Sequence, residues 1–232
     1  MSPPTPPPTS ERPPRKNAAS VRRPSAARGS QSHEVRIIGG LWKRTKLKVI
    51  DKPGLRPSPD RVRETLFNWL GQDLSGWRCV DAFAGTGALG LEAASRGARE
   101  VLLVELDGML VDQLKKSQTQ LGASAVKVLR GDGVAALRQA APASLDLVFI
   151  DPPFDSALFA PALAACARAL KPGGWVYLEA PQHWPLPELA EAGLELYRHL
   201  RAGSVHAHLL KPASADLLKA APADLPNPTP SA

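Results

Sequence analysis

The sequence predicts an α/β fold with a mostly parallel, seven-stranded sheet and helices on both faces. Short apolar runs alternate with helix-forming segments between residues 79 and 179. The runs are nearly continuous in apolar residues, which is typical of parallel strands buried on both faces. Two segments of alternating apolar and polar residues follow at 194–201 and 204–210. They predict a closing antiparallel hairpin that turns at Ala202-Gly203.

Length and composition indicate one sizeable domain with extensions. The chain has 232 residues, 44% of them hydrophobic. No apolar run approaches the roughly 18 residues that a membrane-spanning helix needs, and the N-terminus lacks the apolar region of a secretory signal. The two cysteines have neither disulfide nor zinc spacing. We therefore predict a reduced, cytoplasmic monomer with no membrane partner and no metal site.

Two terminal segments, 1–33 and 212–232, are predicted to be disordered. The first is rich in Pro, Ser and Arg, so it cannot bury enough surface to offset the entropy lost on ordering. Its six basic residues and one acidic residue allow two interpretations, a loose hold on RNA or a solvated tail without a specific job. The second segment consists largely of Ala, Pro and Ser.

The basic character of the folded part lies near its beginning. Residues 34–63 carry nine basic and three acidic residues, whereas residues 64–232 carry 14 basic and 18 acidic ones. A basic front on a mildly acidic body favours a polyanionic partner.

Residues 34–54 are predicted to form a β-hairpin extension. Apolar and basic residues alternate from Val35 to Ile50 around a Gly39-Gly40 turn, so one face should pack on the body. Cations on the other face are usually only solvated, but their density around Trp42 favours a surface that faces RNA. These cations are Lys43, Arg44, Lys46 and Lys48.

A helix opens the main domain, which we place at 55–211. Ser58 is expected to cap this helix and Pro59 to occupy its first position. An apolar stripe that begins at Val62 and Leu66 should pack beside the loop that follows the next strand. Further strands are expected at 79–83, 100–105, 125–130, 145–150 and 175–179, with helices at about 88–96, 107–121 and 156–170 and a short one ending near 140.

A glycine-rich turn joins the first of these strands to its helix. Gly85 and Gly87 allow backbone angles closed to other residues, and the helix points its unpaired N–H groups into the turn. With Gly90 the spacing also fits a dinucleotide-binding fingerprint. Asp81 at the strand end argues against a pyrophosphate and for a cationic ligand. The simplest alternative is a turn that binds nothing.

Acidic residues follow the first four parallel strands. Parallel strands end at the same sheet edge, so these carboxylates should line one site. Glu105 is suited to the two hydroxyls of a ribose, and Asp132 to an adenine amino group. Asp81 suits the ammonium and sulfonium of a methionine moiety. The arrangement therefore favours S-adenosylmethionine over a nicotinamide.

The most specific motif is Asp151-Pro152-Pro153-Phe154. An exocyclic base amine is a poor nucleophile because its lone pair is delocalised into the ring. The carboxylate of Asp151 and the carbonyl of Pro152 can accept its hydrogens, while two prolines fix the backbone. Phe154 offers a face on which an extruded base can stack. As an alternative, a Pro-Pro turn merely ends the strand.

These motifs together resemble the bacterial 16S rRNA (guanine(966)-N(2))-methyltransferases of the RsmD type. The resemblance covers roughly residues 34–211. It includes Arg36-Ile37-Ile38-Gly39-Gly40, the arginine-rich helix from Arg56 to Asn68, the glycine-rich turn and the Asp-Pro-Pro-Phe motif. Ser58 stands where the family more often has Thr, and the long N-terminal tail is outside the family pattern.

The resemblance implies a Rossmann-like class I methyltransferase fold and methylation of guanine N2 in 16S rRNA, on a partly assembled small subunit. The catalytic residues are then Asp151, Pro152, Pro153 and Phe154. The residues that bind S-adenosylmethionine are Asp81, Phe83, Ala84, Gly85, Thr86, Gly87, Glu105, Leu106, Asp132 and Gly133. Those that bind RNA are Arg36, Lys43, Arg44, Lys46, Lys48, Arg56, Arg61 and Arg63.

Two other functions stay open at this stage. A DNA adenine-N6 methyltransferase uses the same kind of Asp-Pro-Pro-aromatic turn, but the chain has no separate domain for reading DNA sequence. A non-catalytic RNA-binding assembly factor is disfavoured because Glu105, Asp151 and Phe154 are intact.

Overall fold

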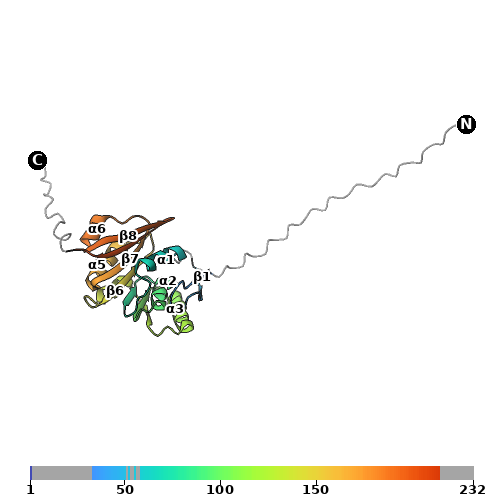
Figure 1. Cartoon of the computed structure of the whole chain (residues 1–232), viewed down its shortest axis with the longest axis horizontal. Helices are drawn as coiled ribbons and strands as arrows, with labels where there is room; N and C mark the ends of the chain where they lie inside the picture. Colours follow the sequence, from blue (N-terminus) through green and yellow to red (C-terminus); the bar gives the residue numbers. More distant parts are fainter. Residues whose placement is uncertain (2–32, 51, 53–54, 56–57, 215–232) are drawn as a thin grey trace. The chain divides into compact units, whose positions relative to one another are not determined.

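The computed structural model describes residues 1, 33–50, 52, 55 and 58–214. The described residues from His33 to Ser214 belong to one compact unit (Figure 1). Nearly all of the two predicted tails lies outside the described residues. Within these ranges, no helix combines the length and apolar character needed to cross a membrane.

A seven-stranded sheet forms the centre of this unit (Figure 1). Its strand order is β5-β4-β3-β6-β7-β9-β8. The first five strands in this order pair in parallel, whereas β9 pairs antiparallel with both β7 and β8. The predicted mostly parallel sheet and closing hairpin are confirmed. The strands are β3 (Arg78–Asp81), β4 (Glu100–Glu105), β5 (Val126–Arg130), β6 (Leu145–Ile150), β7 (Leu170–Ala180), β8 (Leu194–Ala202) and β9 (Val205–Pro212).

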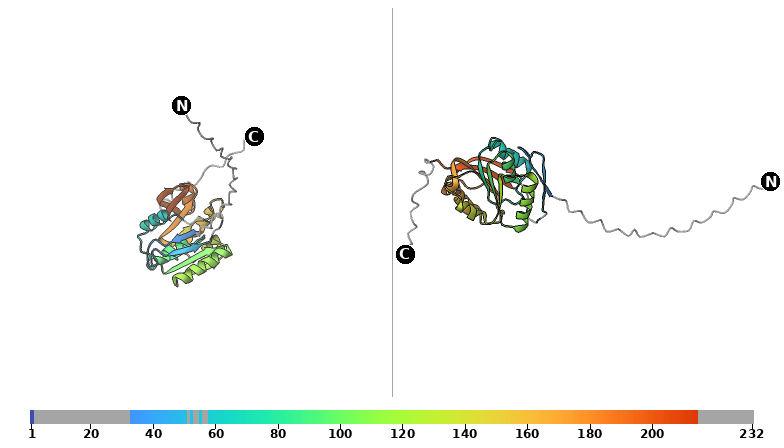
Figure 2. Two further views of the ribbon diagram at one scale, coloured as in Figure 1. Left: turned by 90° about the vertical axis from the view of Figure 1, so that its right-hand side faces the viewer. Right: turned by 90° about the horizontal axis from the view of Figure 1, so that it is seen from below.

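Helices cover both faces of the sheet, as the two further views show (Figure 2). One core cluster contains residues of α1, α2 and α3, and the other contains residues of α4, α5 and α6. The helices are α1 (Asp60–Trp69), α2 (Ala88–Ser95), α3 (Gly108–Leu121), α4 (Gly133–Gln139), α5 (Phe159–Ala169) and α6 (Leu186–Glu191).

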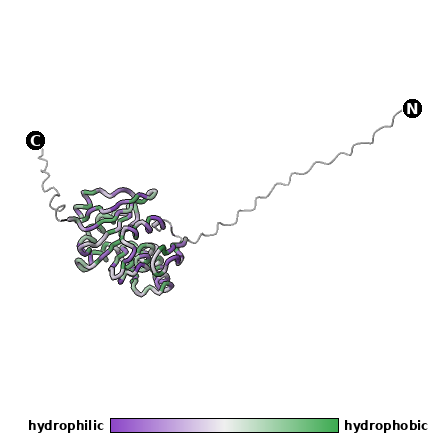
Figure 3. The backbone as a smooth tube through the Cα atoms, in the orientation of Figure 1, coloured by the Kyte–Doolittle hydropathy of each residue, from purple (hydrophilic) through white to green (hydrophobic). Residues whose placement is uncertain are grey.

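The parallel strands supply both cores because successive side chains point to opposite faces. In β6, Leu147 and Phe149 join the cluster under α1 to α3, while Val148 and Ile150 join the cluster under α4 to α6. All four side chains are fully buried. The continuous hydrophobic segments of the central strands are visible along the backbone (Figure 3). This burial explains why the strands lack the alternation of a half-exposed sheet.

The N-terminal extension pairs β1 (His33–Arg36) with β2 (Lys46–Val49) in an antiparallel sheet. The predicted face-to-face alternation is confirmed, because Leu47 and Val49 are buried and Lys46 and Lys48 are exposed. The predicted Gly39-Gly40 turn is only part of the connection between these strands. Residues 37–45 instead form a broad loop that is hydrogen-bonded to α2 through Leu41 N–H and Ser95 O at 2.7 Å.

The reason for two glycines in this loop is its close approach to α2. Gly40 has φ +72°, and a β-carbon there would lie 1.9 Å from the carbonyl oxygen of Ser95. Any other residue would push the loop away from the helix.

Two predicted boundaries differ from the structure. Pro59 is the N-cap of α1, and no side chain caps this helix, because Ser58 lies in the buried contact between α1 and β7 instead. The strand predicted at 175–179 begins earlier, at Leu170, and Pro172-Gly173-Gly174 forms an irregularity inside it, where pairing shifts from Leu145–Leu170 to Leu147–Trp175.

Candidate active site

The loop at residues 82–87, the cofactor loop, joins β3 to α2 as predicted. Gly85 and Gly87 both have positive φ, 50° and 78°, and Gly87 is the N-cap of α2. A β-carbon on Gly87 would lie 2.6 Å from the Leu114 side chain. Glycine is therefore required there both by the backbone angle and by the contact with α3. Thr86 is buried, and its hydroxyl accepts a hydrogen bond from Ala88 N–H at 3.3 Å.

Glu105, at the end of β4, holds the cofactor loop in position. Its Oε2 accepts a hydrogen bond from Gly85 N–H at 2.8 Å, and its Oε1 accepts one from Asp107 N–H at 2.9 Å. The residue is half-buried, so part of the carboxylate faces solvent beside the loop. Each carboxylate oxygen has a second lone-pair site that a ribose hydroxyl could use.

Asp81, at the end of β3, is almost completely buried, with 1% of its surface exposed. Its Oδ2 accepts a hydrogen bond from Gly90 N–H at 3.0 Å, whereas its Oδ1 has no partner among the described residues. Burial raises the pKa of Asp81 to about 7, and the nearby Glu105 and Glu179 act in the same direction. A buried carboxylate oxygen without a partner is costly, so a cationic group beside it would be stabilising. The site therefore fits the ammonium and sulfonium of the expected donor.

The Asp-Pro-Pro-Phe turn lies next to the cofactor loop because β6 pairs with β3. Asp81 is in register with Phe149, and Ala82 N–H donates to Phe149 O at 3.1 Å. Asp151 follows two residues later and is half-buried. Burial raises its pKa well above the usual value, as do the charges of Glu179 and Asp81. The glycine-rich loop, predicted to bind the methyl donor, and the Asp-Pro-Pro-Phe turn, predicted to bind the acceptor, thus follow neighbouring strands.

The rest of the turn divides between the interior and the surface. Pro152 is buried, whereas Pro153 and Phe154 are exposed. Phe154 has 38% of its surface exposed. The ring is therefore accessible to a planar ligand.

Glu179 is an acidic residue of this site to which the sequence analysis gave no role. It lies near the end of β7, next to β6, and only 3% of its surface is exposed. Tyr177 donates a hydrogen bond to its Oε1 at 2.7 Å. Burial raises the pKa of Glu179, while the Ser58 and Tyr177 hydroxyls and the Arg63 charge oppose the shift. In the sequence, the signal for Glu179 is an acidic residue at the end of the apolar strand predicted at 175–179.

The other predicted cofactor residues have more varied surroundings. Asp132 is exposed and caps α4, accepting a hydrogen bond from Ala135 N–H at 2.9 Å. Gly133 packs so closely on β3 that a β-carbon would lie 2.0 Å from Ala82 O. Leu106 is 70% exposed beside Glu105, which leaves an apolar surface where an adenine would lie. Phe83 is half-buried, and Ala84 is buried with its N–H bonded to Val104 O.

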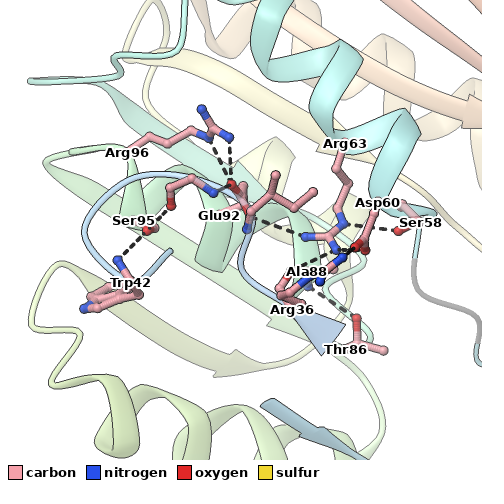
Figure 4. A network of polar contacts seen from close by, with 12 residues as sticks. Arg36, Trp42, Ser58, Asp60, Arg63, Thr86, Ala88, Glu92, Ser95 and Arg96 are labelled. Atoms are coloured by element: carbon pink, nitrogen blue, oxygen red, sulfur yellow. Dashed lines mark hydrogen bonds and ion pairs between the residues drawn. The ribbon is translucent and has the colours of Figure 1, made fainter. Parts of the chain in front are cut away.

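Arg63 is predicted to bind RNA, but in the structure it is buried and lies on no exposed surface. Its side chain is 1% exposed, and its guanidinium donates to Asp60 Oδ1 at 2.7 Å, Glu92 Oε2 at 3.4 Å and the backbone carbonyls of Ser58 and Arg36 (Figure 4). A guanidinium that is buried and uses four of its five N–H groups in this way is not accessible to a phosphate. Arg56 lies outside the described residues.

The remaining predicted RNA-binding residues lie at the surface. Lys43, Arg44, Lys48 and Arg61 are exposed. Arg36 pairs with Asp60, and Lys46 pairs with Glu34, both at 2.8 Å. These two ion pairs are exposed, so they are weak and can exchange for a phosphate.

Two shallow surface hollows lie away from the strand ends. One is lined by α3 residues such as Lys115, and the other lies between α4 and α5 near Arg138 and Arg168. Neither contains a residue of the cofactor loop or of the Asp-Pro-Pro-Phe turn.

The chain is similar to a known family and to several solved structures. The family described as Conserved hypothetical protein 95 matches residues 35–211. Ribosomal RNA small subunit methyltransferase D from Escherichia coli K12 is 41% identical over 182 residues, which cover 76% of this chain and 89% of that relative. The protein of the same name from Haemophilus influenzae is 40% identical and covers 71% of this chain and 92% of the relative.

The solved structures agree with the sequence relatives. A structure from Escherichia coli named as methyltransferase yhhF has a TM-score of 0.67 and 35% identity, covering 78% of this chain and 99% of that one. A structure from Haemophilus influenzae named as methylase HI0767 has a TM-score of 0.65 and 36% identity, covering 78% and 100%. The predicted Rossmann-like class I methyltransferase fold is thereby confirmed. The chain belongs to the RsmD family of ribosomal RNA small subunit methyltransferases.

Proposed function

We propose that this chain transfers a methyl group from S-adenosylmethionine to the exocyclic N2 amine of guanine 966 in 16S ribosomal RNA. The observation that supports this best is the adjacency of the cofactor loop and the Asp-Pro-Pro-Phe turn on paired strands β3 and β6. The guanine target comes from the resemblance to the RsmD family. We also propose that the substrate is a partly assembled small subunit and that the protein acts as a cytoplasmic monomer.

Three features of the chain would hold the methyl donor. Gly85 and Gly87 leave room beside the backbone, and Glu105 would accept hydrogen bonds from the ribose hydroxyls. The unpartnered Oδ1 of Asp81 would face the positive methionine moiety. When bound, the donor would supply an electrophilic methyl carbon on a sulfonium, whose C–S bond breaks so that a neutral thioether leaves.

The Asp-Pro-Pro-Phe turn would position the acceptor. Phe154 would stack on the extruded guanine, and Pro152 O together with the Asp151 carboxylate would accept the two N2 hydrogens. As the nitrogen bonds to the methyl carbon it becomes acidic, and its proton would pass to Asp151 or to water. The raised pKa of Asp151 makes its carboxylate a stronger base at that moment. Holding amine and methyl group in a near-attack geometry would supply much of the rate.

The test uses RNA and small subunits from a strain that lacks the enzyme, with a labelled methyl donor and identification of the product nucleoside. We expect N2-methylguanosine in wild-type reactions. Asp151→Ala should abolish transfer while donor affinity stays within about threefold, because the cofactor loop is intact. Methyladenosine as the product would contradict the proposed substrate, and near-normal turnover by the variant would contradict the role of Asp151.

A further inference from the structure

Four histidines of this chain gather at one end of the β7–β9 region. The chain has five histidines in total. His199 and His208 are directly opposite each other on β8 and β9, His206 lies two residues before His208, and His183 comes from the turn after β7. Ring centroids are 4.6 Å apart for His183 and His199, and 4.8 Å for His199 and His208. We call these four residues the histidine cluster.

Three members of the cluster have the geometry of metal ligands. One ring nitrogen from each of His183, His199 and His208 lies within 4.8 Å of the other two. Nitrogens bound to one tetrahedral Zn²⁺ are about 3.3 Å apart, since Zn–N distances are about 2.0–2.1 Å. The nitrogens therefore need to approach one another by up to about 1.5 Å, and His183 is exposed on the turn after β7.

The hydrogen bonds of His208 determine which of its two ring nitrogens carries the proton. His208 Nδ1 faces Leu178 O at 3.4 Å, and because a carbonyl only accepts, this nitrogen carries the proton. His208 Nε2 then has the lone pair, which at present accepts a hydrogen bond from Trp184 N–H at 3.1 Å. A backbone carbonyl on the far nitrogen is the usual support of a metal-binding histidine.

His206 supports His199 in the same way, through a hydrogen bond to one ring nitrogen. His199 Nε2 and His206 Nδ1 are 3.0 Å apart. With the proton of this bond on His199, its Nδ1 lone pair is available to an ion.

We propose that His183, His199 and His208 bind a divalent late first-row metal ion, with Zn²⁺ as the expected ion. Imidazole suits Zn²⁺, Cu²⁺ and Ni²⁺ better than it suits Mg²⁺ or Ca²⁺. The ion replaces the Trp184 N–H at His208 and fixes the 181–185 turn to the β8–β9 hairpin. The site is independent of the proposed methyl transfer. It also differs from the prediction of no metal site, which considered only cysteine spacing.

The test is zinc titration of untagged, chelator-treated full-length protein by calorimetry, followed by Co²⁺ substitution. We expect one ion per chain and the visible absorption of nitrogen-bound tetrahedral Co²⁺. His183→Ala and His199→Ala should each weaken Zn²⁺ binding by about tenfold or more. His33→Ala changes the one histidine outside the cluster and should have no effect. His208 is avoided because its replacement would open a cavity in the buried sheet.

A second readout separates a bound ion from a folding defect. Zn²⁺ should raise the melting temperature of the wild type and of His33→Ala but not of His199→Ala, whose fold without metal should match the wild type by circular dichroism. Absence of saturable Zn²⁺ binding would overturn the proposal. Equal affinity in the wild type and in both alanine variants would also overturn it, because the ion would then bind elsewhere.

Discussion

The guanidinium of Arg63 lies against the carboxylate of Glu92, with Nη1 3.4 Å from Oε2, and neither side chain is more than 1% exposed. The same carboxylate accepts hydrogen bonds from Ile38 N–H at 2.8 Å and Gly39 N–H at 2.7 Å, and from Arg96 (Figure 4). One buried acid thereby joins α1, α2 and the loop of the N-terminal hairpin. Arg63, which the sequence predicts to bind RNA, instead helps to join these three segments around the acid.

Glu92→Gln should destabilise the protein strongly, since it leaves buried guanidinium groups short of a counter-charge. Removing one partner of a buried ion pair costs about 3–5 kcal/mol. Urea denaturation of the variant should show a loss of this size. Glu64→Gln is the matched control, because Glu64 is exposed on α1 and should change stability by less than about 0.5 kcal/mol. Similar losses in both variants would mean that Glu92 has no special structural role.

Arg63→Met should likewise lower stability but leave the electrostatics of RNA binding unchanged. Its charge is enclosed by protein and is therefore not accessible to a phosphate. At temperatures where the variant is folded, the dependence of RNA affinity on salt should match that of the wild type. Arg61→Met, two residues away and exposed, should instead reduce this dependence. If Arg63→Met reduced the salt dependence of RNA affinity and Arg61→Met did not, Arg63 would belong to the RNA-binding surface.

Donor affinity should depend on pH through Asp81. In the free protein this carboxyl has a pKa of about 7, so at lower pH a proton must leave before a cationic ligand can pair with it. Affinity should therefore fall as pH drops below 7, by up to about tenfold per unit. Calorimetry with wild type and Asp81→Asn isolates this effect, because ionisation of the donor itself is common to both. A constant ratio of the two affinities between pH 5.5 and 8 would contradict the assignment.

The same carboxyl should make the folded protein less stable as pH rises, whereas donor affinity increases as pH rises. The folded state keeps the proton of Asp81 up to about pH 7, whereas the unfolded state loses it near pH 3.8. The contribution of this group to stability therefore falls as pH rises between these values, by up to about 4 kcal/mol. Asp81→Asn cannot ionise and should lack this decline. Thermal unfolding of both proteins in the absence of donor across this pH range measures the difference.

Glu179→Gln should shift the pH–rate profile of methyl transfer to lower pH. Removing this neighbouring negative charge stabilises the Asp151 carboxylate and so lowers its pKa. The acid limb of the profile should move accordingly, while donor affinity changes little at a fixed pH of 8. Glu100→Gln, on the opposite end of a strand, is the control and should leave the profile in place. An unshifted profile for Glu179→Gln would show that Glu179 does not tune Asp151.

The features that were predicted correctly depend on local patterns. Gly85 and Gly87 mark a turn by themselves, and Asp151 follows a strand whose apolar run is unambiguous. Both motifs follow the carboxyl ends of parallel strands, and these ends lie at one edge of the sheet. The fold and the positions of these two motifs could therefore be predicted from short windows of sequence.

The features that were missed depend on partners distant in the chain. Arg63 looks like a surface cation until Glu92, 29 residues later, is placed beside it. The Gly39-Gly40 pair looks like a hairpin turn until α2 approaches. His199 and His208 come together because β8 pairs with β9, and His183 reaches them from the turn after β7. Contacts between segments that are distant in the chain, rather than sequence spacing, create these clusters.

Reversing the exposed cations of the hairpin should weaken RNA binding without changing donor affinity. Lys43, Arg44 and Lys48 are exposed, and none of them shares an element with the cofactor loop. Three lost phosphate contacts should reduce the slope of log affinity against log salt by about 2. Filter binding over a salt series, with donor calorimetry in parallel, measures both quantities. Reversal of exposed Arg138, Arg198 and Arg201 changes the net charge equally on α4 and β8. A general loss of positive charge would affect both triple variants alike. Equal slopes of log affinity against log salt for the two variants would therefore mean that the hairpin cations are solvated and do not bind RNA.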